Sequence, residues 1–200
     1  MLGRRNGVAA LIRANVPYLI EQHCVAHRED LGIDDAWGKV SLMKNIETLL
    51  RTVYTVFSRS SVKKTAFEEL ANVSDEDVVS FRPLNEVRWM SRHFAVKALM
   101  KNYTILIEYF QKQVEEDNDP IANYCLKELQ NPQVHVALTV LHEVLAELAD
   151  LCTVFQRSCI STIEAVQFAK AKISKLKSQY LEGNEVYWSD SVCCCQQLVM

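Results

Sequence analysis

Apolar residues recur at the period of an α-helix through most of this chain. From Leu42 onward they fall at i, i+1, i+4, i+7, i+8, i+11, i+12 and i+15, a stripe that comprises Leu42, Met43, Ile46, Leu49, Leu50, Val53, Tyr54 and Phe57. A helix with one wide apolar face must bury that face against other elements. The pattern therefore predicts a helical body that begins at about residue 41.

The same period continues downstream and predicts further helices over residues 61–72 and 85–115. Asp119-Pro120 and Asn131-Pro132 each place a capping side chain before a proline, which fits the first position of a helix. Two more helices therefore begin at these dipeptides, and the second is long. We expect its apolar stripe to pack antiparallel to the next segment, through Ile160, Ile163, Val166, Ile173 and Leu176.

The first forty residues follow a different pattern. Residues 3–15 predict a helix that Pro17 ends, and Tyr18 to Val25 is a short, largely apolar run that predicts a single strand. A lone strand leaves its backbone N–H and C=O groups without partners, which is costly when they are buried. We therefore expect the other strands of this part of the fold to lie outside the chain. Residues 183–200 have no clear periodicity and predict an irregular tail.

Composition limits the possible functions. The 200 residues include 22 Lys and Arg against 25 Asp and Glu, so the formal net charge is −3. Because phosphate binding relies on clustered basic side chains, any contact with DNA must be local. Charges interrupt the apolar segments before they reach membrane-spanning length, and the N-terminus lacks the apolar stretch of a signal peptide. We expect a soluble intracellular protein whose seven cysteines are thiols.

Two motifs carry a resemblance to a known family. His23-Cys24-Val25-Ala26-His27-Arg28 contains a Cys-x-x-His pair, and Asn85-Glu86-Val87-Arg88-Trp89-Met90-Ser91-Arg92 places an Arg-Trp pair in a helical region further along the chain. In this order the motifs resemble the hAT superfamily of cut-and-paste transposases and the host proteins derived from them. The resemblance extends over residues 1 to about 180.

The resemblance implies a fold. The catalytic core of the family looks like ribonuclease H, a mixed sheet flanked by helices, and a large helical insertion precedes its last acidic helix. Residues 1–40 would be part of that core, residues 41–182 the helical insertion domain and residues 183–200 the tail. The expected fold class is mainly α: the C-terminal part of a ribonuclease H-like fold, with one strand and a flanking helix, followed by an all-helical insertion.

The resemblance also implies that this chain is not an enzyme. The second catalytic aspartate of the family would precede Met1, and Glu164 is the one candidate for the last acidic residue. Two-metal phosphoryl transfer needs the full set of carboxylates, so we expect no catalytic residue, metal or cofactor. Cys24 and His27 would form a structural motif, because no second Cys or His pair follows at zinc-ligand spacing. Localisation in the nucleus would follow from the family.

Trp89 and its basic neighbours are the candidate nucleic-acid residues. In active members of the family a tryptophan of the insertion stacks on a flipped base, which requires a flat aromatic surface near phosphates. Arg88 and Arg92 lie about one turn apart and suit the phosphate backbone. Lys97 and Lys101 would extend this local patch. The alternative is that Trp89 packs in the helical core while the arginines are solvated.

Two hypotheses for function follow. The first is a catalytically inactive, hAT-transposase-derived nuclear protein that keeps the fold for association with DNA or protein. The second is a helical protein-interaction module with no nucleic-acid role, whose apolar stripes serve a partner or a homodimer. Exposure of Arg88, Trp89 and Arg92 beside a groove favours the first hypothesis, and their burial favours the second. No membrane partner is expected.

Other conspicuous residues receive no function. His135 and His142 are two turns apart on one predicted helix, but no carboxylate at matching spacing supports a metal site. The densest basic run is expected to be spread over more than one helical face in solvent, and it comprises Lys170, Lys172, Lys175 and Lys177. Cys193, Cys194 and Cys195 are adjacent, and neighbouring cysteines do not readily chelate one tetrahedral metal.

Overall fold

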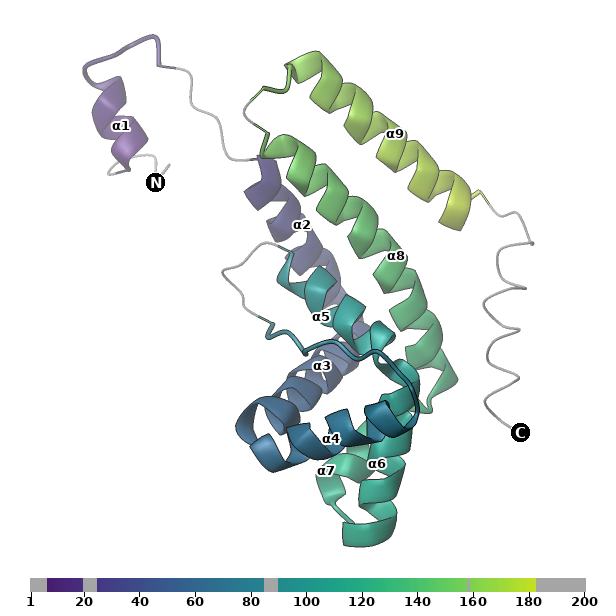
Figure 1. The fold of residues 1–200 in the computed structure, drawn as a ribbon. Helices are drawn as coiled ribbons and strands as arrows, with labels where there is room; N and C mark the ends of the chain where they lie inside the picture. The colour runs from purple at the N-terminus through teal and green to yellow at the C-terminus, as the bar shows by residue number, and fades with distance from the viewer. Residues whose placement is uncertain (1–6, 20–24, 85–89, 158, 183–200) are drawn as a thin grey trace.

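The computed structural model describes residues 7–19, 25–84, 90–157 and 159–182, and this part of the chain is mainly helical and contains no strand (Figure 1). Its helices are α1 (Val8–Arg13), α2 (Val25–Lys39), α3 (Ser41–Arg59), α4 (Ser61–Val73), α5 (Ser91–Lys101), α6 (Tyr103–Asp117), α7 (Pro120–Leu129), α8 (Pro132–Phe155) and α9 (Thr162–Tyr180). The prediction of a mainly α class is confirmed. None of the described helices combines the length and the apolarity that crossing a membrane requires.

The core is formed by residues of α2 to α8. In α3 the predicted stripe is confirmed, because Ile46, Leu49, Leu50, Val53 and Phe57 are buried. α8 runs along the molecule and packs against α2 and α5, while α6 packs against α7 (Figure 1). An aromatic cluster joins α3, α4 and α6 to the segment that follows α4, and it consists of Phe57, Phe67, Phe81, Tyr109 and Phe110.

Both predicted helix starts with proline are confirmed. The side chain of Asp119 accepts a hydrogen bond from the backbone N–H of Ile121 at 2.8 Å. That of Asn131 accepts one from the N–H of Gln133 at 3.0 Å. Each cap satisfies a donor that has no partner inside the helix, and each proline occupies a position where its missing N–H costs nothing.

The single helix expected over residues 85–115 is instead two helices. Residues 85–89 lie outside the described residues, and α5 and α6 meet at Asn102, whose side chain is only 1% exposed. Its amide oxygen accepts the backbone N–H of Val79 at 2.9 Å, and its amide nitrogen donates to the carbonyl of Val79 at 2.7 Å. The amide thus pairs with the backbone of a distant segment, which periodicity alone does not reveal.

The strand expected at Tyr18 to Val25 is not formed at its described ends. Tyr18 lies in a turn, while Val25 is the first residue of α2; residues 20–24 lie outside the described residues. Ile33 and Trp37, four residues apart, pack against the core from one face of α2. This helical spacing lies just beyond the run that suggested a strand.

The last helix packs on α8 as expected, but three of the five residues expected at the contact face away from it. α9 runs back along α8 in the antiparallel direction (Figure 1). Ile163, Val166 and Ile173, which were expected at this contact, are 72%, 47% and 52% exposed. The half-buried side of α9 includes Phe168 and Leu176. The sequence shows two apolar stripes on α9, and periodicity does not say which one meets α8.

Candidate nucleic-acid interface

A groove of about 840 Å³ lies between α5 and the segment after α4, and we call it the basic groove. Arg82 lines it from that segment, Lys97 and Lys101 line it from α5, and His142 reaches it from α8. Phe94 supplies an apolar surface and is 45% exposed. The groove therefore combines cations with an accessible aromatic ring.

The segment after α4 is held in place by apolar side chains that pack into the core and by hydrogen bonds to its backbone. Val78 and Phe81 point into the core, and the ring of Phe81 stacks on Phe57 with centroids 4.8 Å apart. Arg82 is exposed and faces the basic groove. The two hydrogen bonds between the Asn102 side chain and the backbone of Val79 fix the middle of this wall. This wall of the groove is therefore anchored by apolar packing against the core and by the buried amide of Asn102.

Among the described residues, no strong ion pair neutralises the cations of the groove. Lys101 approaches Asp77 only at 3.8 Å, and both side chains are well exposed, so this pair contributes little. Arg82 and Lys97 form no ion pair within the described segments. The pKa of His93, next to the groove on α5, is lowered by burial and further by Lys97 and His142. This shift favours the neutral form of His93, and the neighbouring cations make a locally positive surface that suits an anionic ligand.

Arg92 is engaged inside the molecule. Its guanidinium forms an ion pair with Asp34 at 2.6 Å and lies over the ring of Trp37, 5.3 Å from the centroid. The Arg92 side chain is 18% exposed. These contacts join α5 to α2, so the charge of Arg92 is already used in packing. Arg88 and Trp89, the other two candidates, lie outside the described residues.

The remaining candidate residues for a site do not lie together in the structure. Cys24 lies outside the described residues, and His27 is exposed on α2. His135 packs its ring against Tyr103, with centroids 4.8 Å apart, and burial lowers its pKa. In the described part of the chain no group of His, Cys, Asp and Glu side chains is arranged to hold a metal ion.

Glu164 belongs to a helix cap. Its carboxylate accepts the backbone N–H of Ser161 at 2.9 Å, while the Ser161 hydroxyl accepts the N–H of Glu164 at 3.2 Å. These bonds form a capping box at the start of α9 and lower the pKa of Glu164. The carboxylate of Glu164, the candidate for the last acidic residue of the family, thus caps the start of α9.

The basic groove was foreseen only in part. Lys97 and Lys101 are one turn apart on α5 and were predicted as a local patch, whereas Arg82 and His142 join them only through tertiary packing. Phe94 lies on α5 three residues before Lys97, so helical spacing could have added it to the patch. No family model and no solved structure matches this chain. Its function is therefore inferred from the sequence resemblance together with the geometry of the groove.

Proposed function

We propose that this chain is the helical part of a hAT-transposase-derived nuclear protein that does not cleave DNA and associates with nucleic acid through the basic groove. In this proposal residues 1–40 belong to a ribonuclease H-like core, and residues 41–182 form its helical insertion. The observation that carries it is the convergence of Arg82, Lys97 and Lys101 around the exposed ring of Phe94.

The chemistry of the groove fits a single strand. Phosphates would lie against Arg82, Lys97 and Lys101, while an unpaired base would stack on Phe94. Such stacking is worth roughly 1–3 kcal/mol per base and tolerates any sequence. Because the chain as a whole carries a net charge of −3, we expect the attraction of phosphates to be local to such a patch. Binding is then weak, independent of sequence and strongly dependent on salt.

The absence of nuclease activity is part of the proposal. Glu164 is occupied as a helix cap, and the resemblance places the other acidic residues outside this chain. Chain purified with magnesium or manganese should neither nick nor join DNA. Metal-dependent cleavage that disappears with one substitution inside the chain would contradict this.

Charge reversal in the groove tests the binding proposal. We expect Lys97→Glu with Lys101→Glu to weaken binding of a fluorescent single-stranded oligonucleotide at least about tenfold, because two phosphate contacts become repulsive. Fluorescence anisotropy measures the affinity. The control pair, Lys44→Glu with Lys127→Glu, changes the net charge equally at exposed positions that do not line the groove. Equal losses in both pairs, or no loss in the first, would contradict a binding site at the groove.

The alternative function is a helical protein-interaction module with no nucleic-acid role. One observation favours it: Arg92, expected at a nucleic-acid surface, is paired with Asp34 and packed on Trp37. Under this alternative the oligonucleotide does not bind measurably at low salt, where electrostatic attraction is strongest. The same anisotropy experiment on the unaltered chain therefore separates the two functions.

A further inference from the structure

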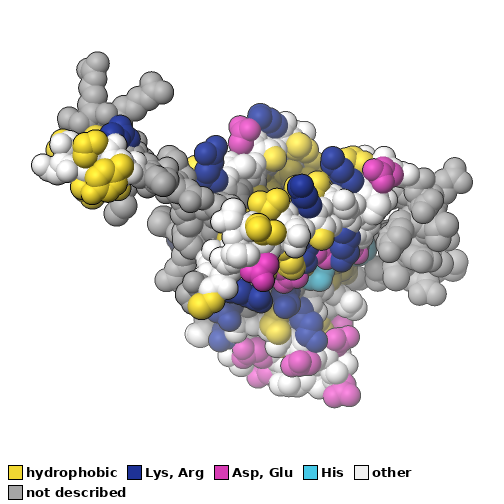
Figure 2. All heavy atoms as spheres, turned by 90° about the horizontal axis from the view of Figure 1, so that it is seen from above, with side chains coloured by type: hydrophobic (Ala, Val, Ile, Leu, Met, Phe, Trp, Pro, Cys, Tyr) yellow, Lys and Arg dark blue, Asp and Glu magenta, His cyan; other side chains and the backbone are white. Residues whose placement is uncertain are grey.

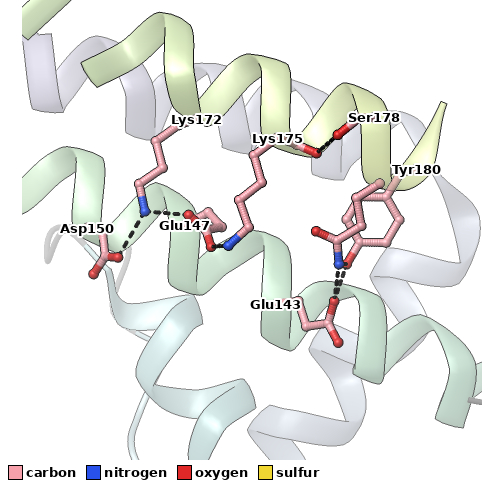
Figure 3. A network of polar contacts seen from close by, with 8 residues as sticks. Glu143, Glu147, Asp150, Lys172, Lys175, Ser178 and Tyr180 are labelled. Atoms are coloured by element: carbon pink, nitrogen blue, oxygen red, sulfur yellow. Dashed lines mark hydrogen bonds and ion pairs between the residues drawn. The ribbon is translucent and has the colours of Figure 1, made fainter. Parts of the chain in front are cut away.

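The inner face of α9 is attached to α8 by polar contacts (Figure 3). Glu147 of α8 pairs with both Lys172 and Lys175, and Lys172 also reaches Asp150 at 3.0 Å. Further along the helix, Glu143 accepts a hydrogen bond from Gln179 at 2.7 Å. These contacts use the lysines of the inner face and leave the opposite face of α9 turned away from α8.

The opposite face has a repeating pattern. Ile163, Val166, Lys170, Ile173 and Lys177 follow one another at intervals of three and four residues and lie within about 80° of the helix circumference. This is the spacing of the contact positions of a coiled coil, with isoleucine or valine between lysines. We call these five residues the outer seam. Figure 2 shows hydrophobic and basic side chains side by side on the face of the molecule seen from above.

The outer seam is accessible, and its lysines have no charge partner in the part of the chain that the structure describes. Its three apolar side chains are about half exposed or more, and Lys170 and Lys177 are exposed as well. Neither lysine forms an ion pair within the residues that the structure describes. No carboxylate lies on the seam, since the acidic residue of α9, Glu164, points about 100° away and caps the helix.

We infer that the outer seam pairs with an acidic amphipathic helix of another protein, which places carboxylates opposite Lys170 and Lys177 and apolar side chains opposite the remaining three residues. A lysine at a contact position of a coiled coil selects its partner, because burying its charge opposite an apolar or basic residue is costly. Opposite a carboxylate the same lysine becomes a specific ion pair. This inference does not rest on nucleic-acid binding.

Charge argues against a second copy of this chain as the occupant. In an antiparallel pair the symmetry axis would fall at the middle of the seam, on Lys170, and bring two ammonium groups together. In a parallel pair in register, Lys170 and Lys177 would each face their own copy. Like charges at facing positions are destabilising, whichever way the helices run. The narrow seam also differs from the broad apolar face with which helices lie on membranes.

A designed peptide supplies the probe. Its helix carries leucine at the contact positions and glutamate at the two that face Lys170 and Lys177; one version is built for parallel pairing and one for antiparallel pairing. A matched peptide has lysine in place of both glutamates. Anisotropy of the labelled peptides with the full chain gives the affinities. We expect one acidic peptide to bind at least about tenfold more tightly than its lysine counterpart, because the ion pairs replace repulsion.

Charge reversal on α9 provides the decisive comparison. Lys170→Glu with Lys177→Glu should abolish the preference for the acidic peptide and favour the lysine peptide, while Lys44→Glu with Lys127→Glu should leave the preference unchanged. Circular dichroism checks that each variant keeps its helices. Binding of neither acidic peptide, or binding that ignores the change at Lys170 and Lys177, would overturn the inference. Self-association of the unaltered chain, or binding to phosphatidylserine vesicles, would also overturn it if Val166→Ser with Ile173→Ser removed that association.

Discussion

Individual polar side chains determine how the candidate site is built. Asn102 is buried and makes two hydrogen bonds to the backbone of Val79, which lines the basic groove. Arg92 forms an ion pair with Asp34, and its guanidinium lies over the ring of Trp37. One residue thus holds the groove wall and the other joins two helices. Both are polar residues whose partners lie far away in the sequence.

Replacing Asn102 tests the first of these roles. We expect Asn102→Ala to lower the free energy of unfolding by about 1–3 kcal/mol, because the backbone groups of Val79 lose both partners in a partly buried place. Urea unfolding followed by circular dichroism measures it. Asn123→Ala, at an exposed position of α7, is the control. A loss at Asn102 no larger than at Asn123 would show that the pairing does not stabilise the fold.

Two histidines give stability a predictable dependence on pH. Burial lowers the pKa of His93 and of His135 below the ordinary value of 6.5. Between the lowered and the ordinary value the unfolded chain binds more protons than the folded chain, so the free energy of unfolding rises with pH. The stabilisation is complete above about pH 6.5 and is lost as pH falls through the folded pKa values.

We therefore expect the melting temperature to fall between about pH 7.5 and about pH 5.5, and His93→Gln with His135→Gln to reduce that fall. The carboxylates of Asp119 and Glu147 also have lowered pKa values, but their ordinary values of 3.8 and 4.5 lie below this range. Melting curves at a series of pH values provide the measurement, and His27→Gln controls for the loss of an exposed histidine. If the melting temperature depended on pH in the double variant as it does in the unaltered chain, His93 and His135 would not be the source of the dependence.

At the scale of elements, α9 differs from the helices of the core. It has no buried residue, whereas α3 buries five and α6 buries five. Its contact with α8 consists largely of ion pairs around Glu147 and of the half-buried side chains beside them. Elements with few buried apolar contacts open most readily. α9 should therefore exchange its amide hydrogens faster than α3 or α6 does.

Glu147→Gln weakens this attachment selectively. Each partly exposed ion pair is worth about 0.2–1 kcal/mol, and the change removes the charge that both Lys172 and Lys175 contact. We expect amide exchange in α9 to accelerate about fivefold, with little change in global stability. Glu116→Gln, which removes the exposed pair with Lys112, should leave α9 unaffected. Equal protection of α9 in both variants would mean that the pairs at Glu147 do not hold it.

At the scale of the whole molecule, local signals predicted the elements better than their contacts. The stripe of α3 and the caps at Asp119 and Asn131 depend on neighbouring residues, and the structure confirms them. The division at Asn102 depends on Val79, which lies 23 residues away, so the sequence shows no sign of it. The three apolar residues of the outer seam were predicted to face α8, but they lie on the opposite side of α9.

The basic groove illustrates the same limit. Lys97 and Lys101 share one helix face and were predicted as a patch, but Arg82 and His142 come from other elements and required the fold. The net charge of −3 describes the whole chain and not the local surface where these side chains meet. A basic binding surface can therefore exist on an acidic protein.

The salt dependence of single-strand binding tests the central claim most directly. Binding at Arg82, Lys97 and Lys101 would neutralise about three phosphates, and each contributes about −0.7 to the slope of log affinity against log salt concentration, so a slope of about −2 is expected. In Lys97→Gln with Lys101→Gln, two of these contacts are lost, and the slope should shrink to about −0.7. A slope near zero for the unaltered chain, or an equal slope for the variant, would contradict nucleic-acid binding in the basic groove.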